Sequence, residues 1–78
     1  MSLKQDMENA GWIFNEYYCY KMFGEYEIDI EFCIGDYCVG IYKDQELLEP
    51  KLREPDFIQA LIRASYLQRI YEQTTGNI

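Results

Sequence analysis

Three carboxylates at alternate positions are the first candidates for chemistry in this 78-residue sequence. Residues 26–34 read YEIDIEFCI, so Glu27, Asp29 and Glu31 alternate with apolar side chains. On a β-strand they would share one face, about 6.5–7 Å apart. Carboxylates at such distances can act as general acid and base or bind a hard cation. Because no glycine-bearing loop or converging ligand accompanies them, we expect no metal and no other cofactor, and we interpret them as the acidic, solvent-exposed surface of a sheet.

Thiol chemistry is the second possibility, since the chain has three cysteines and no histidine. Cys33 and Cys38 are expected to face each other across a turn, at the short end of disulfide geometry. Their spacing differs from the Cys-x-x-Cys redox motif, and a third zinc ligand would have to be the distant Cys19. Without histidine there is no Ser-His or Cys-His nucleophile. We therefore expect reduced, packed thiols, no catalytic residues and no enzyme.

The charge balance argues against nucleic acid as a direct partner. Seven Lys and Arg against fourteen Asp and Glu give a formal charge of −7, which repels a phosphate backbone. No apolar run is long enough to cross a membrane, and the few cysteines and the lack of a secretory segment favour a reducing cytoplasm. The 49% hydrophobic and 17% aromatic content predicts a folded chain rather than a disordered one.

The pattern along the chain predicts one small α+β domain spanning residues 1–78. A short N-terminal helix over residues 3–10 begins with Ser2 as N-cap and ends at Gly11. A three-stranded antiparallel sheet follows, and a long C-terminal helix starts after Glu54-Pro55-Asp56. The strands are expected at residues 12–23, 26–34 and 37–42. The predicted order is α-β-β-β-α.

The turn residues allow two registers for the first hairpin and predict a single register for the second. Around Gly24, a two-residue turn would place one set of residues in the core and a three-residue bulged turn another. The first set is Tyr17, Cys19 and Phe23, and the second is Phe14, Tyr18, Tyr20 and Met22. A two-residue turn at Gly35-Asp36 predicts a register for the second hairpin. Its pairs are Ile34 with Tyr37, Cys33 with Cys38, Phe32 with Val39, and Ile30 with Ile41.

The C-terminal half contains a polar connection and the clearest helix. Residues 43–54 have room for a turn of helix around residues 46–48, ended by Pro50. From residue 57 onward, a helical repeat predicts one apolar face. Its members are Phe57, Ala60, Leu61, Ala64, Leu67 and Tyr71. A second apolar stripe, Ile62, Tyr66 and Ile70, lies roughly opposite. A helix with two apolar sides is either sandwiched within its own fold or docked on another chain.

The first strand is rich in aromatic side chains that could stack on nucleic-acid bases. RNA-binding sheets surround such rings with Lys and Arg, whereas here the neighbours are Glu16, Asp29 and Glu31. We therefore assign Trp12 and the tyrosines at positions 17, 18 and 20 to core and interface packing.

The last helix resembles a known family. Pro55 followed by Ala60-Leu61-Ile62-Arg63-Ala64-Ser65-Tyr66-Leu67 is similar to the Pro…Ala-Ile-x-Arg-Ala-x-Leu-Leu helix of small phage and prophage proteins of the phage ABA sandwich type. The order of elements also agrees over nearly the whole chain, although the family's Trp-rich second strand is missing here. The resemblance implies helix, sheet and helix layers and a phage or prophage origin, hence the cytoplasm of a bacterial host. It implies no catalytic residues.

These observations predict a small non-enzymatic protein that binds another protein or itself, for example as a homodimer. The predicted contact surface consists of Ile62, Tyr66, Ile70, Tyr18 and Tyr20. The alternative is an acidic DNA mimic that inhibits a host nucleic-acid enzyme. Its phosphate-like groups would be Glu25, Glu27, Asp29, Glu31 and Asp36. A carboxylate–metal enzyme is a third hypothesis.

Overall fold

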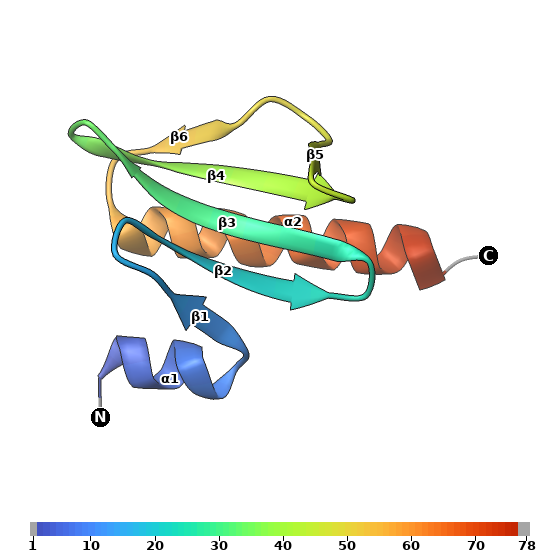
Figure 1. Ribbon diagram of the computed structural model, residues 1–78, viewed down its shortest axis with the longest axis horizontal. Helices are drawn as coiled ribbons and strands as arrows, with labels where there is room; N and C mark the ends of the chain where they lie inside the picture. The colour runs from blue at the N-terminus through green and yellow to red at the C-terminus, as the bar shows by residue number, and fades with distance from the viewer. Residues whose placement is uncertain (1, 77–78) are drawn as a thin grey trace.

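An antiparallel sheet and one long helix form two layers, with a short helix beside one edge of the sheet (Figure 1). The computed structural model describes residues 2–76, with side chains up to residue 73. In chain order the elements are α1 (Leu3–Asn9), β1 (Trp12–Phe14), β2 (Tyr18–Phe23), β3 (Tyr26–Cys33), β4 (Asp36–Lys43), β5 (Glu46–Leu47), β6 (Leu52–Glu54) and α2 (Phe57–Gly76). The predicted α+β class is confirmed, and no helix in residues 2–76 combines the length and apolar character needed to cross a membrane.

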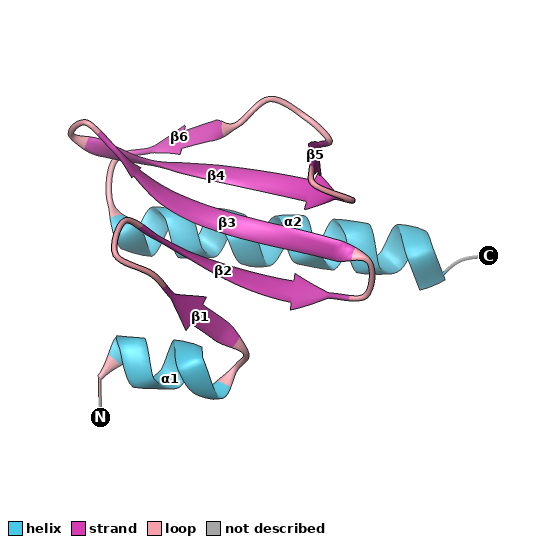
Figure 2. Ribbon diagram, viewed as in Figure 1, coloured by secondary structure: helices cyan, strands magenta, loops and turns pink. Residues whose placement is uncertain are grey.

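The prediction of three strands is wrong, because the sheet within residues 2–76 has six (Figure 2). Four strands pair in sequence order, β1-β2-β3-β4, and β5 and β6 pair with separate segments of the free edge of β4. The expected first strand is divided by a loop at residues 15–17, where the Asn15 amide donates to the Tyr18 carbonyl at 2.8 Å. No Gly or Pro marks that loop, and Asn15 and Glu16 alone interrupt the aromatic, β-rich residues there, so the sequence predicts one strand.

The connection after β4 forms strands rather than the expected turn of helix. Asp44 and Gln45 have φ angles of 52° and 66°, in the left-handed region, and they reverse the chain directly after β4. Two consecutive residues with positive φ are typical of the tight turn that favours hairpins. The chain consequently runs back along β4, first as β5 and then as β6.

Of the two predicted alternatives, the first hairpin adopts the two-residue turn. Phe23 pairs with Tyr26, and Gly24 adopts a φ of 56° in the turn between them. Cys19 and Phe23 are buried as that alternative requires. Tyr17 is 72% exposed instead, because it lies in the loop before β2 begins.

The predicted register of the second hairpin is wrong by two residues. Cys33 pairs with Asp36, and Ile30 pairs with Val39, so the turn consists of Ile34 and Gly35. Gly35 has a φ of 85°, which explains why it takes the second turn position rather than the first. A shift of two residues leaves every strand side chain on its face, so Ile28 and Ile30 are buried as expected. The alternation also predicts Phe32 and Ile34 on the core face, but Phe32 is 58% exposed near the end of β3 and Ile34 is 99% exposed in the turn.

The core lies between the sheet and the inward face of α2, which is the predicted one. Ala60, Ala64 and Leu67 are buried against the sheet. The fully buried side chains opposite them are Ile28, Ile30, Val39 and Ile41. Phe57, Leu61 and Tyr71 pack at the margin of this cluster. The two alanines have no side chain beyond Cβ, which lets the helix approach the sheet closely.

Both helices are capped by their own side chains. Ser2 accepts a hydrogen bond from the Gln5 amide at 3.1 Å, which confirms it as the N-cap of α1, and Gly11 follows that helix with a φ of 106°. At α2, the Asp56 carboxylate accepts from the Gln59 amide at 2.8 Å. An acidic N-cap also interacts favourably with the helix dipole.

Substituting two isoleucines of the β3–β4 hairpin tests this assignment of the core. Ile41→Ala should lower the free energy of unfolding by about 2–5 kcal/mol, because Ile41 is fully buried and a cavity would remain. Ile34→Asn should change it by no more than about 0.5 kcal/mol, since Ile34 is 99% exposed in the turn. Urea unfolding measures both. Equal losses from the two substitutions would contradict the assignment of the core.

Candidate functional site

A row of apolar side chains runs along the side of α2 that faces away from the sheet. Ile58, Ile62 and Tyr66 are 51%, 59% and 55% exposed, and Ile70 is 37% exposed. Residues four apart lie on the same side of a helix, so these four form one continuous line, which we call the α2 ridge. Neither α1 nor the 43–54 connection covers it. Sequence analysis missed Ile58, although its spacing of four from Ile62 was the available signal.

The surroundings of the α2 ridge are hollowed and carry positive charge. Pockets of about 300 and 430 Å³ lie beside Ile62 and Tyr66. Between residues 57 and 71 the helix has no carboxylate, and its charged side chains are Arg63 and Arg69. Arg63 donates to Glu54 at 3.2 Å, whereas Arg69 forms no ion pair with any residue of the described chain. In a protein of charge −7, this face is a local exception.

Tyr18 and Tyr20 do not join the α2 ridge, which corrects the predicted contact surface. They pair with Glu31 and Asp29, whose side chains alternate with the buried isoleucines of β3. Both tyrosines therefore point away from α2, and their rings contact each other with centroids 5.9 Å apart. The sequence could not show that the two tyrosines and the α2 ridge lie on opposite sides, because it allowed two registers for the first hairpin.

We call the side of the sheet away from α2 the outer sheet face. Its exposed apolar members are Ile13 (49%), Tyr18 (39%), Met22 (55%) and Leu47 (40%). The predicted acidic residues Glu27, Asp29 and Glu31 form a row along its middle strand, β3. This face thus combines apolar and acidic side chains.

Ion pairs cancel much of the acidic charge that DNA mimicry would need. Glu31 pairs with Lys51 at 3.1 Å, Asp36 with Arg53 at 3.1 Å, and Glu25 with Lys43 at 3.4 Å. Hydrogen bonds with Glu31 and Tyr42 raise the pKa of Lys51, so this cation stays charged. Three of the five proposed phosphate-like groups therefore have a cation beside them, which weakens the mimicry hypothesis.

Asp29 is the most perturbed carboxyl group of the described chain. Burial, followed by a hydrogen bond with Glu27 and the charge of Glu27, raises the pKa of Asp29 to about 8. Its Oδ1 atom is inaccessible and accepts no hydrogen bond from the described residues. Asp29 therefore keeps its proton at neutral pH and adds no full negative charge to the acidic row of β3.

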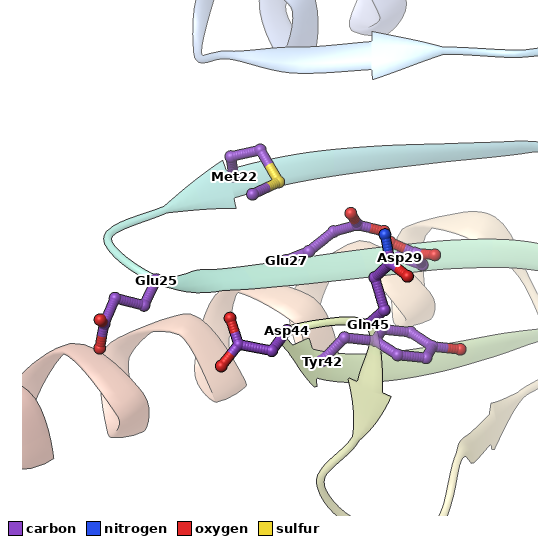
Figure 3. A pocket seen from close by; sticks show the side chains of 7 residues that line it. All are labelled: Met22, Glu25, Glu27, Asp29, Tyr42, Asp44 and Gln45. Atoms are coloured by element: carbon purple, nitrogen blue, oxygen red, sulfur yellow. The ribbon is translucent and has the colours of Figure 1, made fainter.

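A pocket of about 480 Å³ opens beside this carboxyl pair (Figure 3). It is lined by Met22, Glu25, Glu27, Asp29, Tyr42, Asp44 and Gln45. Gly40 pairs with Asp29 and contributes no side chain. A Cβ atom at position 40 would lie 3.0 Å from the Tyr42 ring, so this ring packs directly over the glycine. In residues 2–76, no three Asp, Glu, Cys or His side chains are placed to hold a metal ion together. The pocket instead suits a cationic group, such as a guanidinium.

The cysteines are placed as packed thiols. Cys33 and Cys38 are diagonal neighbours on the outer sheet face rather than opposite each other, because of the two-residue register difference. A hydrogen bond with Cys38 raises the pKa of Cys33 to about 11, and burial raises that of Cys19 to about 11. Both thiols are therefore protonated, and poorly nucleophilic, near neutral pH.

Comparison with known proteins returns no match to a family model, to a curated protein or to a solved structure. The resemblance to phage ABA sandwich proteins accordingly stays a prediction from the sequence.

The protonated Asp29 predicts an unusual dependence of stability on pH. In the unfolded chain Asp29 ionises near the ordinary aspartate pKa of 3.8, whereas in the folded chain it keeps its proton up to a pKa of about 8. The folded state binds the extra proton between these values, so the Asp29 contribution to stability falls as the pH rises from 4 to 8. Asp29→Asn should remove this loss, because an amide is neutral and can still donate to Glu27.

Thermal unfolding across this pH range measures the effect. At pH 8 the Tm of Asp29→Asn should exceed that of the wild type by roughly 4–8 °C, which is the shift that about 1 kcal/mol produces in so small a domain. Near pH 4 the two Tm values should converge. Glu16→Gln, in the exposed β1–β2 loop, is the matched control and should change Tm little at either pH. A constant difference between Asp29→Asn and the wild type at all pH values would contradict the assignment.

Proposed function

We propose that this protein is a small, non-enzymatic protein of phage or prophage origin that acts by binding another protein through the α2 ridge. The observation that carries the proposal is the exposure of Ile58, Ile62 and Tyr66, each more than half accessible along one line of a folded helix. Single exposed apolar residues are common, but a contiguous row is typical of an interaction surface.

The energetics favour a covered ridge. Burying an isoleucine or leucine side chain completely contributes about 1.5–3 kcal/mol, so covering several half-exposed ones recovers a few kcal/mol. Tyr66 adds a ring and a polar tip, a combination enriched at protein interfaces. The pockets on both sides of Ile62 and Tyr66 can accept side chains of a partner, as the grooves beside a helix ridge commonly do.

The polar features of the chain support a binding role rather than catalysis. The chain has no histidine, and burial raises the thiol pKa of Cys19 away from reactivity. The proton that Asp29 keeps has a structural role, because it allows this carboxyl group to be partly buried beside Glu27. The phage or prophage origin depends only on the resemblance found in the sequence, in the motif of α2 and the expected order of elements.

Site-specific photo-crosslinking tests the proposed binding function. A photoreactive phenylalanine analogue in place of Tyr66 should join the chain to a protein on irradiation in the cells that produce it. Ile62→Glu in the same chain should abolish the adduct, because it places a carboxylate in the contact without disturbing the core.

The same probe in place of Tyr17 is the matched control. Tyr17 is more exposed than Tyr66, at 72%, but lies in the β1–β2 loop, near Phe57 at the start of α2 and not on the α2 ridge. The proposal is contradicted if position 66 gives no more protein adduct than position 17, or if Ile62→Glu leaves the adduct unchanged.

A further inference from the structure

We propose that the α2 ridge binds the outer sheet face of a second copy of this chain, so that copies associate head to tail. This inference rests on the proposed function and names the partner of the same surface. The two surfaces lie on opposite sides of one molecule, the helix behind the sheet and the outer face in front of it (Figure 1).

The apolar side chains of the two surfaces repeat at similar distances. Along the ridge, residues four apart are separated by about 6 Å. Along β2, residues two apart on the outer face are separated by about 6.5–7 Å. Ile62 and Tyr66 can therefore pack beside successive outer side chains of β2, whose members are Tyr18, Tyr20 and Met22.

The charges beside these apolar rows are complementary. Arg69 lies next to the ridge and forms no ion pair within residues 2–76. On the outer sheet face, Glu27 and Asp44 line the 480 Å³ pocket and also form no ion pair with the described residues. A guanidinium can donate to several carboxylate oxygens at once, and Met22 joins this pocket to the apolar row of β2. The pocket can thus receive Arg69 of a second copy.

A two-fold contact between two α2 ridges is less favourable on charge. It would bring the Arg63 and Arg69 side chains of both copies to one interface and leave the outer sheet face unused. Head-to-tail contact instead joins a surface without carboxylates to one rich in them. The overall charge of −7 opposes association only weakly at physiological salt, because screening acts within about 8 Å. Contacts of this heterologous kind produce rings or open filaments rather than closed dimers.

Charge exchange between the two surfaces tests the inference. The oligomeric mass of the full chain is followed by light scattering and sedimentation as the protein concentration rises. The wild type should form species larger than a dimer. Arg69→Glu and Glu27→Arg should each weaken association on the order of tenfold, because each places like charges together. The double variant Arg69→Glu/Glu27→Arg should regain association, since it restores opposite charges with the sign reversed.

Matched controls change the same charge elsewhere. Lys4→Glu on α1 and Glu16→Arg in the β1–β2 loop alter the net charge equally and should leave association unchanged, and circular dichroism confirms that each variant is folded. Association that is indifferent to Glu27→Arg would overturn the inference. If Arg69→Glu also strengthened association, an α2–α2 dimer would replace it, because that substitution removes the repulsion between arginines.

A monomer at every concentration, or a double variant that stays dissociated, would also overturn it. The crosslink at position 66 separates this failure from failure of the proposed function. An adduct with a different protein would leave the proposed function standing and reject the second copy, whereas no adduct at all would reject both.

Discussion

Packing of the two alanines of α2 against β3 and β4 is the contact on which the rest of the structure depends. Ala60 and Ala64 are 0% and 1% exposed, and the isoleucines at positions 28 and 41 beneath them are both at 0%. Small residues on the helix and β-branched residues on the sheet bring the two layers close together. With only 78 residues, this one interface supplies most of the core, and it covers one face of the sheet and one side of the helix.

Two surfaces are left uncovered by that arrangement, and they differ in character. The α2 ridge is apolar and flanked by arginines, whereas the outer sheet face combines apolar side chains with carboxylates. Each is the side of an element that the core does not use. A third layer would have hidden one of them, but α1 packs at β1, at the edge of the sheet (Figure 1). The proposed head-to-tail contact uses both surfaces at once.

The electrostatics of the outer face depend on residues from distant parts of the chain. Lys51 comes from the segment before β6, yet it neutralises Glu31 of β3 at 3.1 Å. Burial and the neighbouring Glu27 hold a proton on Asp29, so the acidic row of β3 carries less negative charge than its composition suggests. What is left unpaired, at Glu27 and Asp44, lies at one pocket rather than along the whole strand. A localised charge of this kind is suited to binding a single cation. It is poorly suited to imitating the regularly spaced phosphates of DNA.

Local patterns in the sequence determined the helices, the alternation of faces in β3 and β4, and the inward side of α2. These follow from spacings of two and of about 3.6 residues, which depend only on backbone geometry. The tertiary structure decided the number of strands, the register of the second hairpin and the placement of Tyr18 and Tyr20 relative to the α2 ridge. Those features depend on where Asn15, Gly35 and the Asp44–Gln45 pair turn the chain, and a pairing shift of two residues preserves every face. The raised pKa of Asp29 could not be predicted from the sequence, because its burial and its hydrogen bond with Glu27 exist only after the sheet has formed.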